Sequence, residues 1–298
     1  MDDLRAAAIA LYDRYTHEGM DRRAFMAELT RVAGSAAAAS ALLAGIAADP
    51  AAATLVPEAD KRIRTHRMNW PVSGGRTMKG YRSEPRSPAG ELGSVLVIHE
   101  NRGLNAHIED VTRRFAVAGF RAVAADFLSP VGGTPTDQDA ARDAIGKLDL
   151  WTAAADAVAT LRVLKSLPAS NGKVGAVGFC WGGGMVNRIA LVAGAALDAG
   201  VSFYGPAPDP ALAPQVRSAL QLHFAELDER VNKTGFPWRD ALAAAGGTVE
   251  AHVYPKVNHA FHNDTSAERY NAPAAQLAWT RTLDFLGRHL AYRVVASG

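Results

Sequence analysis

KVGAVGFCWGGG, residues 173–184, joins an apolar, strand-like run to a helix-like run through the pattern Gly-x-Cys-x-Gly. This order is typical of a nucleophile elbow, with Cys180 where most such elbows carry serine. Gly178 and Gly182 lie two residues to either side of the cysteine, where a β-carbon would collide with the neighbouring strand or helix. The alternative is a tight strand–helix turn with an inert cysteine, because free cysteine is often a small core residue.

A cysteine nucleophile needs a histidine base and a carboxylate that orients it, and in this type of fold the chain order is nucleophile, acid, histidine. Two strand-like runs, Leu220–Phe224 and Thr248–Tyr254, are each followed by a loop with such groups. Loops at the carboxyl ends of parallel strands are where open α/β sheets form their sites. In the first loop, spacing does not choose among three acids, Glu226, Asp228 and Glu229. In the second loop it favours His259 as the base.

The other histidines give little support for a metal site. His262 lies three residues after His259, a spacing found in some metal pairs, but no Cys or Glu at ligand spacing completes a set. His223 and His252 lie within strand patterns and are expected to be structural. The sequence therefore predicts no metal site and no cofactor.

Length and composition restrict the class of protein. The 298 residues are enough for one large domain plus an extension, and 48% are apolar, which supports a sizeable core. The formal charge is +2 without any Lys/Arg run, so no nucleic-acid partner is expected. The single cysteine excludes an internal disulfide. No feature addresses the oligomeric state.

Strand-like and helix-like runs alternate from Ser94 onward, which predicts an α/β fold with a mostly parallel central sheet covered by helices on both faces. Two further runs, Arg62–Trp70 and Thr77–Arg82, predict an antiparallel hairpin at one edge. The strand-like runs are Ser94–His99, Arg121–Ala125, Lys173–Gly178, Gly200–Tyr204, Leu220–Phe224 and Thr248–Tyr254; the helix-like runs are Ile108–Ala118, Gln138–Ile145, Trp151–Ser166, Cys180–Val192, Thr234–Ala245 and Ala272–Leu290.

Residues 1–55 differ from the rest, so we divide the chain into an N-terminal extension, 1–55, and a catalytic domain, 56–298. Asp2–His17 is expected to form an amphipathic helix. The pair Arg22-Arg23, the alanine-rich run Val32–Ala48 and the small residues that follow it resemble a twin-arginine export signal, which would place the protein in the periplasm. The alternative is a helical arm that packs on the domain or a second subunit, in a cytoplasmic protein. The apolar run is too short and too alanine-rich for a stable membrane span.

Four segments in order resemble the dienelactone hydrolase family (carboxymethylenebutenolidase-like) of the α/β-hydrolases: VLVIHENRGL at 95–104, GFCWGG at 178–183, ELD at 226–228 and NHAF at 258–261. The resemblance runs from about Arg76 to Leu290. It implies an α/β-hydrolase fold with Cys180 as nucleophile, Asp228 as acid and His259 as base. It thus selects Asp228 among the three acids that spacing left open.

Further roles follow from the elbow and from the resemblance. The backbone N–H of Trp181, the residue after the nucleophile, is expected to be one oxyanion donor. By resemblance the second is the N–H of Asn101. The resemblance also gives Glu100 a part in switching the thiol to thiolate when substrate binds, which protects a resting thiol from oxidation. The alternative for Glu100 is a loop carboxylate paired with Arg102.

One departure from the family concerns the substrate. Dienelactone hydrolases place an arginine shortly after the catalytic histidine to hold the substrate carboxylate, whereas here Asn263 stands in that region and no arginine occurs before Arg269. An arginine fork is not reproduced by Asn or His. We therefore expect an ester or lactone other than dienelactone.

Three aromatic residues are candidates for contact with the substrate. Trp181 and Phe261 adjoin the nucleophile and the base and are expected to form apolar pocket walls. Tyr204, at a strand end, either lines the pocket or is a packed aromatic residue.

The sequence thus predicts a hydrolase of small-molecule esters or lactones that uses a Cys-His-Asp triad and an acyl-enzyme. The alternative is a non-catalytic ligand-binding module on a degenerate hydrolase scaffold. A thiol-redox protein is disfavoured because Cys180 has no Cys-x-x-Cys partner.

Overall fold

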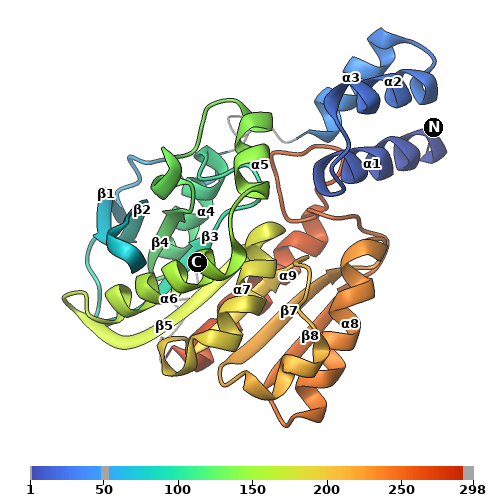
Figure 1. The fold of residues 1–298 in the computed structure, drawn as a ribbon. Coiled ribbons are helices and arrows are strands. Elements are labelled where there is room, and N and C mark those ends of the chain that lie inside the picture. Colours follow the sequence, from blue (N-terminus) through green and yellow to red (C-terminus); the bar gives the residue numbers. More distant parts are fainter. Residues whose placement is uncertain (1, 48–53, 291–298) are drawn as a thin grey trace.

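An eight-stranded sheet forms the centre of the computed structural model, which describes residues 2–47 and 54–290 (Figure 1). The strand order is β1-β2-β4-β3-β5-β6-β7-β8. The strands are β1 (Ile63–Pro71), β2 (Thr77–Pro85), β3 (Leu92–Ile98), β4 (Arg121–Asp126), β5 (Ser170–Phe179), β6 (Ala199–Phe203), β7 (Ala219–Ala225) and β8 (Val249–Tyr254). The pairs β1–β2 and β2–β4 are antiparallel and the other five are parallel. The predicted mostly parallel sheet and edge hairpin are confirmed.

Helices cover both faces of the sheet. The α-helices of the described residues are α1 (Asp2–His17), α2 (Arg22–Ala33), α3 (Ala36–Ile46), α4 (Ala106–Val117), α5 (Gln138–Gly146), α6 (Leu150–Lys165), α7 (Trp181–Val192), α8 (Glu229–Ala244) and α9 (Ala272–His289), with 3₁₀ turns at Ser73–Gly75, Ser129–Val131, Gly194–Ala196 and Pro210–Gln215. Successive residues of β3 alternate between two cores, because side chains of a strand point to opposite faces. Helices α6, α7 and α8 contribute to one core, and α4 and α9 to the other.

Helix α8 begins earlier than its sequence pattern predicts. It starts at Glu229 instead of Thr234, because the Asp228 side chain accepts a hydrogen bond from the N–H of Val231 and caps the first turn. The capping residue is thus the predicted catalytic acid. Similarly, Cys180 stands just before α7 and not within it.

The first three helices form an N-terminal unit, residues 2–46, which lies to one side of the sheet in Figure 1 with α1 nearest the rest of the molecule. It has a small core of its own, in which Phe25 is buried and stacks on Tyr15 at 4.4 Å between ring centroids. Arg22, of the predicted twin-arginine pair, binds Asp139 of α5 at 2.6 Å. The small residues Pro50–Ala53 lie outside the described residues, and the choice between export signal and structural arm stays a prediction.

None of the described helices is by itself long and apolar enough to cross a membrane, although α2 and α3, bent by 109° at their junction, meet that criterion of length and composition as a pair.

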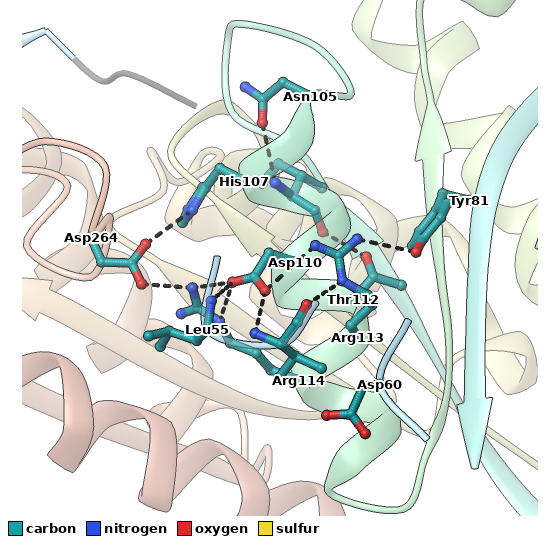
Figure 2. A network of polar contacts seen from close by, with 12 residues as sticks. Leu55, Asp60, Tyr81, Asn105, His107, Asp110, Thr112, Arg113, Arg114 and Asp264 are labelled. Carbon is teal, nitrogen blue, oxygen red and sulfur yellow. Dashed lines mark hydrogen bonds and ion pairs between the residues drawn. The ribbon is translucent and has the colours of Figure 1, made fainter. Parts of the chain in front are cut away.

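A network of charged groups ties α4 to two distant segments (Figure 2). The buried Asp110 carboxylate accepts hydrogen bonds from the N–H groups of Leu55 and Val56, which precede β1, and from Arg114. Arg114 also binds Asp264 at 2.6 Å, and His107 lies 3.2 Å from the same carboxylate. Because Asp264 belongs to the loop between β8 and α9, the network fixes the loop that carries the predicted base, His259.

We expect Asp264→Asn to lower the free energy of unfolding at pH 7 by about 1–3 kcal/mol, the cost of leaving buried partners unpaired. Burial raises the pKa of Asp264, but His107 and Arg114 outweigh it and lower that pKa to about 2. A folded pKa below the unfolded value gives stability that is present above about pH 4 and lost as the pH falls through 2. Urea unfolding at pH 7 and pH 3 measures both effects. Equal stability of variant and wild type at pH 7 would contradict this role.

Candidate active site

The turn from β5 into α7 holds Cys180 in a strained conformation. Its backbone has φ 55° and ψ −114°, which is rare for a residue with a side chain. The positions two residues before and after Cys180 must be glycine, because neighbouring backbone leaves no room for a β-carbon there. A β-carbon on Gly178 would overlap the carbonyl group of Gly182, and one on Gly182 would overlap the carbonyl of Ile98 in β3. A β-carbon on Gly183 would lie 2.6 Å from the carbonyl oxygen of Phe203, so that glycine brings α7 close to β6.

The acid and the histidine reach this turn from the next two strand ends. His259, in the loop after β8, places its Nδ1 2.5 Å from Oδ2 of Asp228. Its Nε2 is buried and has no hydrogen-bond partner in the described part of the chain. The imidazole and the Cys180 thiol offer atoms within 4.8 Å of each other. The structure therefore brings the three predicted triad residues together.

Charge outweighs burial at the base. Burial lowers the pKa of His259, but the charges of the Asp228 carboxylate and the Cys180 thiolate act against it and raise that pKa to about 10. In the same way, burial raises the pKa of Asp228, but the charge of His259 and its hydrogen bond hold it below its ordinary value. The arrangement thus favours a His259 imidazolium that is oriented by the Asp228 carboxylate.

A third residue, His17 at the end of α1, lies against both reacting side chains. Its Nε2 is 4.0 Å from Cys180 Sγ, and its ring meets that of His259 edge to face at 4.8 Å between centroids. Removal from water, and then the charge of His259, hold the pKa of His17 well below its ordinary value, so the ring is neutral. Sequence reasoning missed this residue, because no local spacing relates it to the elbow.

The same three residues are a group within the described chain that could hold a metal ion, since their ligand atoms lie within 4.8 Å of one another. A cation bound there would occupy Cys180 and His259, the predicted nucleophile and base. His262, the other candidate ligand, is buried between Phe179 and Phe203, away from this group.

Glu100 lies beside the triad and is held by two side chains. Asn263 donates from Nδ2 to Oε2 of Glu100 at 2.8 Å, and the Tyr204 hydroxyl is 3.4 Å from Oε1. Asn263, which is predicted from the sequence to replace the family's arginine, thus contacts Glu100. The alternative pairing of Glu100 with Arg102 is not formed, because Arg102 binds Asp139 and the carbonyl of Gln138.

Of the three aromatic residues, Phe261 alone departs from what the sequence predicts. Trp181 lines a groove and stacks on His99 at 5.4 Å. Phe261 is fully buried and forms no wall, because Ala260, with φ 63°, turns the chain so that Phe261 packs on Tyr254 at 4.8 Å. Tyr204 is likewise fully buried, with its ring against His259 at 4.9 Å. It is a packed aromatic residue that supports the base.

Arg269 is buried near the site although it lies ten residues after His259. Its guanidinium donates to the carbonyl of Ile46 at 3.2 Å, lies 3.8 Å from Asp13 and sits over the Tyr12 ring at 5.0 Å. Three of its contacts are thus made by the N-terminal unit. Burial raises the pKa of Asp13, although His259 and Arg269 oppose this.

Two spaces meet at Cys180. The first, which we call the groove, has a volume of about 780 Å³ and is lined in part by Met20, Trp181 and Arg230. The second, the inner cavity, has about 20 Å³, room for roughly one water molecule, and is lined in part by Glu100 and Arg269. Both spaces share the lining residues Thr16, His17, Asn101 and Cys180.

The elbow, the acid and the histidine, in this order and on this sheet, are those of an α/β-hydrolase. The family described as "Dienelactone hydrolase family" matches residues 78–290 of the sequence. The chain belongs to the dienelactone hydrolase family, and it is an enzyme of the ester and lactone hydrolase class.

Relatives and solved structures agree with this assignment. A carboxymethylenebutenolidase of Pseudomonas putida is 32% identical over 213 residues, which are 67% of this chain and 88% of the relative. A structure from Klebsiella pneumoniae, provisionally described as a dienelactone hydrolase, is 26% identical with a TM-score of 0.67 and covers 76% of this chain and 99% of its own. A dienelactone hydrolase-like promiscuous phosphotriesterase from metagenomic libraries, 23% identical with a TM-score of 0.68 and the same coverage, shares the fold.

We expect Gly182→Ala to destabilise the protein by about 1–3 kcal/mol and to remove most activity, because the added methyl group overlaps the Ile98 carbonyl and must displace the elbow. Gly90→Ala is the matched control, since no other group lies within 4 Å of the place that its added methyl group would take. Thermal unfolding and ester hydrolysis measure both. A stable, active Gly182→Ala enzyme would show that the elbow tolerates a side chain.

We expect the His259 imidazole to titrate near pH 10 in the wild type, and at least about one pH unit lower in Asp228→Asn, which lacks the orienting charge. The folded pKa of His259 exceeds its ordinary value of 6.5. The charged imidazolium therefore contributes stability that is fully present below pH 6.5 and is lost as the pH rises through 10. NMR titration of the imidazole measures this without any substrate. Glu229→Gln, in the same loop, is the control, and a wild-type pKa near 6.5 would contradict the ion pair.

Proposed function

We propose that this chain is a cysteine-dependent hydrolase of carboxylic esters or lactones, with Cys180 as nucleophile, His259 as base and Asp228 as the acid that orients it. The observation that carries the proposal is the 2.5 Å bond from His259 to Asp228, beside a cysteine held in a nucleophile elbow. A structural cysteine has no need of either partner.

The proposed reaction proceeds in two stages and needs no cofactor. The Cys180 thiolate attacks the carbonyl carbon, and the resulting tetrahedral oxyanion collapses with loss of the alkoxide, which takes the proton of the His259 imidazolium. The product is a thioester of Cys180. Neutral His259 then removes a proton from water, the hydroxide adds to the thioester, and collapse releases the acid and the thiolate.

The backbone N–H groups of Trp181 and Asn101 are the proposed donors to the oxyanion. Trp181 opens α7, where helix N–H groups lack partners within the helix. Neither N–H donates a hydrogen bond to any group in the described part of the chain, so both are available to a substrate oxygen. Removal of such a donor typically costs roughly a hundredfold or more in rate.

A neutral ester or lactone is the proposed substrate. Arg269 lies near the nucleophile, but the chain's own Asp13, Ile46 and Tyr12 occupy its guanidinium. It is therefore not free to hold a substrate carboxylate as the family's arginine does. Among the cationic residues that line the groove, Arg230 and Lys147 make no ion pair with another described residue, so these two are the cations that could meet an anionic substrate.

Hydrolysis of a panel of small esters and lactones, including dienelactone, tests the proposal in the wild type, Cys180→Ser and Cys180→Ala. We expect turnover of neutral esters and little of dienelactone. We expect a loss of at least about a thousandfold in the alanine variant, which lacks the nucleophile. A thioester of Cys180 should be trapped by acid quench and found by mass spectrometry.

The other outcomes are distinct. Strong turnover of dienelactone that Arg230→Ala weakens through KM alone would assign the carboxylate to Arg230 and contradict a preference for neutral substrates. Absence of turnover in both wild type and Cys180→Ala, with a ligand still bound, would favour the non-catalytic binding module. Equal turnover by the two proteins would instead remove Cys180 as the nucleophile.

A further inference from the structure

The N-terminal unit, residues 2–46, covers the proposed nucleophile. Besides the contacts of His17 with Cys180 and His259, the side chain of Asn101 donates to the backbone carbonyl of Thr16 at 3.1 Å. The end of α1 therefore touches the elbow, the base and the loop of the second oxyanion donor. Cys180 itself is only 5% exposed.

Contacts away from the triad hold this unit on the loop that follows His259. Ser266 donates from Oγ to the carbonyl of Ile46 at 2.7 Å, beside the buried Arg269 already described. Arg5 donates to the carbonyl oxygen of Glu268 at 3.1 Å. The first and third helices of the unit thus both bind the segment 266–269.

A second set of contacts holds the unit on α5. Arg22 pairs with Asp139, and the Arg142 guanidinium sits over the Tyr15 ring at 4.3 Å. Figure 1 shows α5 and the loop before α9 on the side of α1 that faces the sheet. The unit is therefore attached both to α5 and to the loop before α9.

His17 stands where the groove and the inner cavity meet, since it lines both. The groove, at about 780 Å³, is large enough for a small organic substrate, whereas the inner cavity, at about 20 Å³, is not. Truncation of the imidazole would join the two spaces beside Cys180. The side chain thereby limits the size of the group that can lie on the Glu100 side of the sulfur.

We propose that the N-terminal unit is the lid of this active site and that His17 is a specificity-determining residue, which confines the substrate to the groove and excludes bulky groups from the inner cavity. The consequence for substrate choice rests on the proposed hydrolase function, but the control of access to the thiol does not. The substrates that fit are esters or lactones with the larger part in the groove and a small group beside the inner cavity.

Thiol alkylation tests access directly, because Cys180 is the only cysteine of the chain and every added mass reports on it. Three full-length proteins are treated with iodoacetamide and with the bulkier fluorescein maleimide: the wild type, His17→Ala and the matched control His66→Ala. His66 is exposed on the edge strand β1. We expect Cys180 of His17→Ala to react with the maleimide about tenfold faster than in the wild type. The rate of reaction with iodoacetamide should change less than about threefold, because removal of a steric barrier affects mainly the larger reagent. His66→Ala should match the wild type.

A change in thiol reactivity is distinguishable from a change in access. A more nucleophilic sulfur in His17→Ala would accelerate both reagents alike, and this outcome would overturn the proposal. Equal maleimide rates in wild type and His17→Ala would overturn it too.

Phe25→Ala tests the lid as a unit. Phe25 is buried among the three helices and stacked on Tyr15, and the groove and inner cavity are lined by other residues. Loosening this core should also accelerate maleimide labelling, and an unchanged rate would contradict a lid that holds His17 in place. Circular dichroism would verify that the sheet domain of each variant stays folded.

Ester hydrolysis then links the lid to function. We expect the ratio of kcat/KM for hexanoyl over acetyl esters to rise at least about fivefold in His17→Ala, because a joined cavity accepts a longer group. An unchanged ratio in an active enzyme would remove His17 as a specificity determinant. If no variant hydrolyses an ester but maleimide rates differ as expected, the proposed function fails and the lid stands.

Discussion

Close approach of backbone at the start of α7 is the constraint on which the site depends. The strand β5, the neighbouring β3 and the first turn of α7 meet so tightly that neither Gly178 nor Gly182 has room for a β-carbon. The chain can pass this point only if Cys180 adopts a left-handed backbone, an arrangement that costs of order 1–3 kcal/mol. Burial of apolar side chains on both faces of the sheet offsets this cost.

The second requirement is electrostatic. A buried imidazolium needs a compensating charge, which the Asp228 carboxylate at the end of β7 supplies to His259. Asp228 caps α8 with the same carboxylate, so helix formation and orientation of the base depend on one residue. The loop of His259 is held in turn by Asp264 through Arg114 (Figure 2). An ion pair outside the predicted triad thus helps to determine where His259 stands.

Sequence reasoning succeeded where the signal is local. The elbow, the sheet and the loops after β7 and β8 follow from patterns of fewer than about fifteen residues, the range over which periodicity and turn chemistry act. It failed for His17, which meets Cys180 from 163 positions away. Periodicity shows that α1 has an apolar face, but not what that face docks on. For Phe261, residue type suggested a pocket wall, whereas the left-handed turn at Ala260, which no pattern marks, directs the ring into the core.

Two unusual features of the sequence, the missing arginine after the histidine and the helical extension at the N-terminus, meet at the same place. Asn263 binds Glu100, and Arg269, the next arginine along the chain, reaches the neighbourhood of the nucleophile from a different position. There it binds the Asp13 carboxylate of α1 and the backbone carbonyl of Ile46 at the end of α3. A substrate carboxylate would have to displace the chain's own contacts from this guanidinium. The proposed preference for neutral substrates would then follow from the N-terminal extension, because Arg269 stabilises the N-terminal unit instead of a substrate carboxylate.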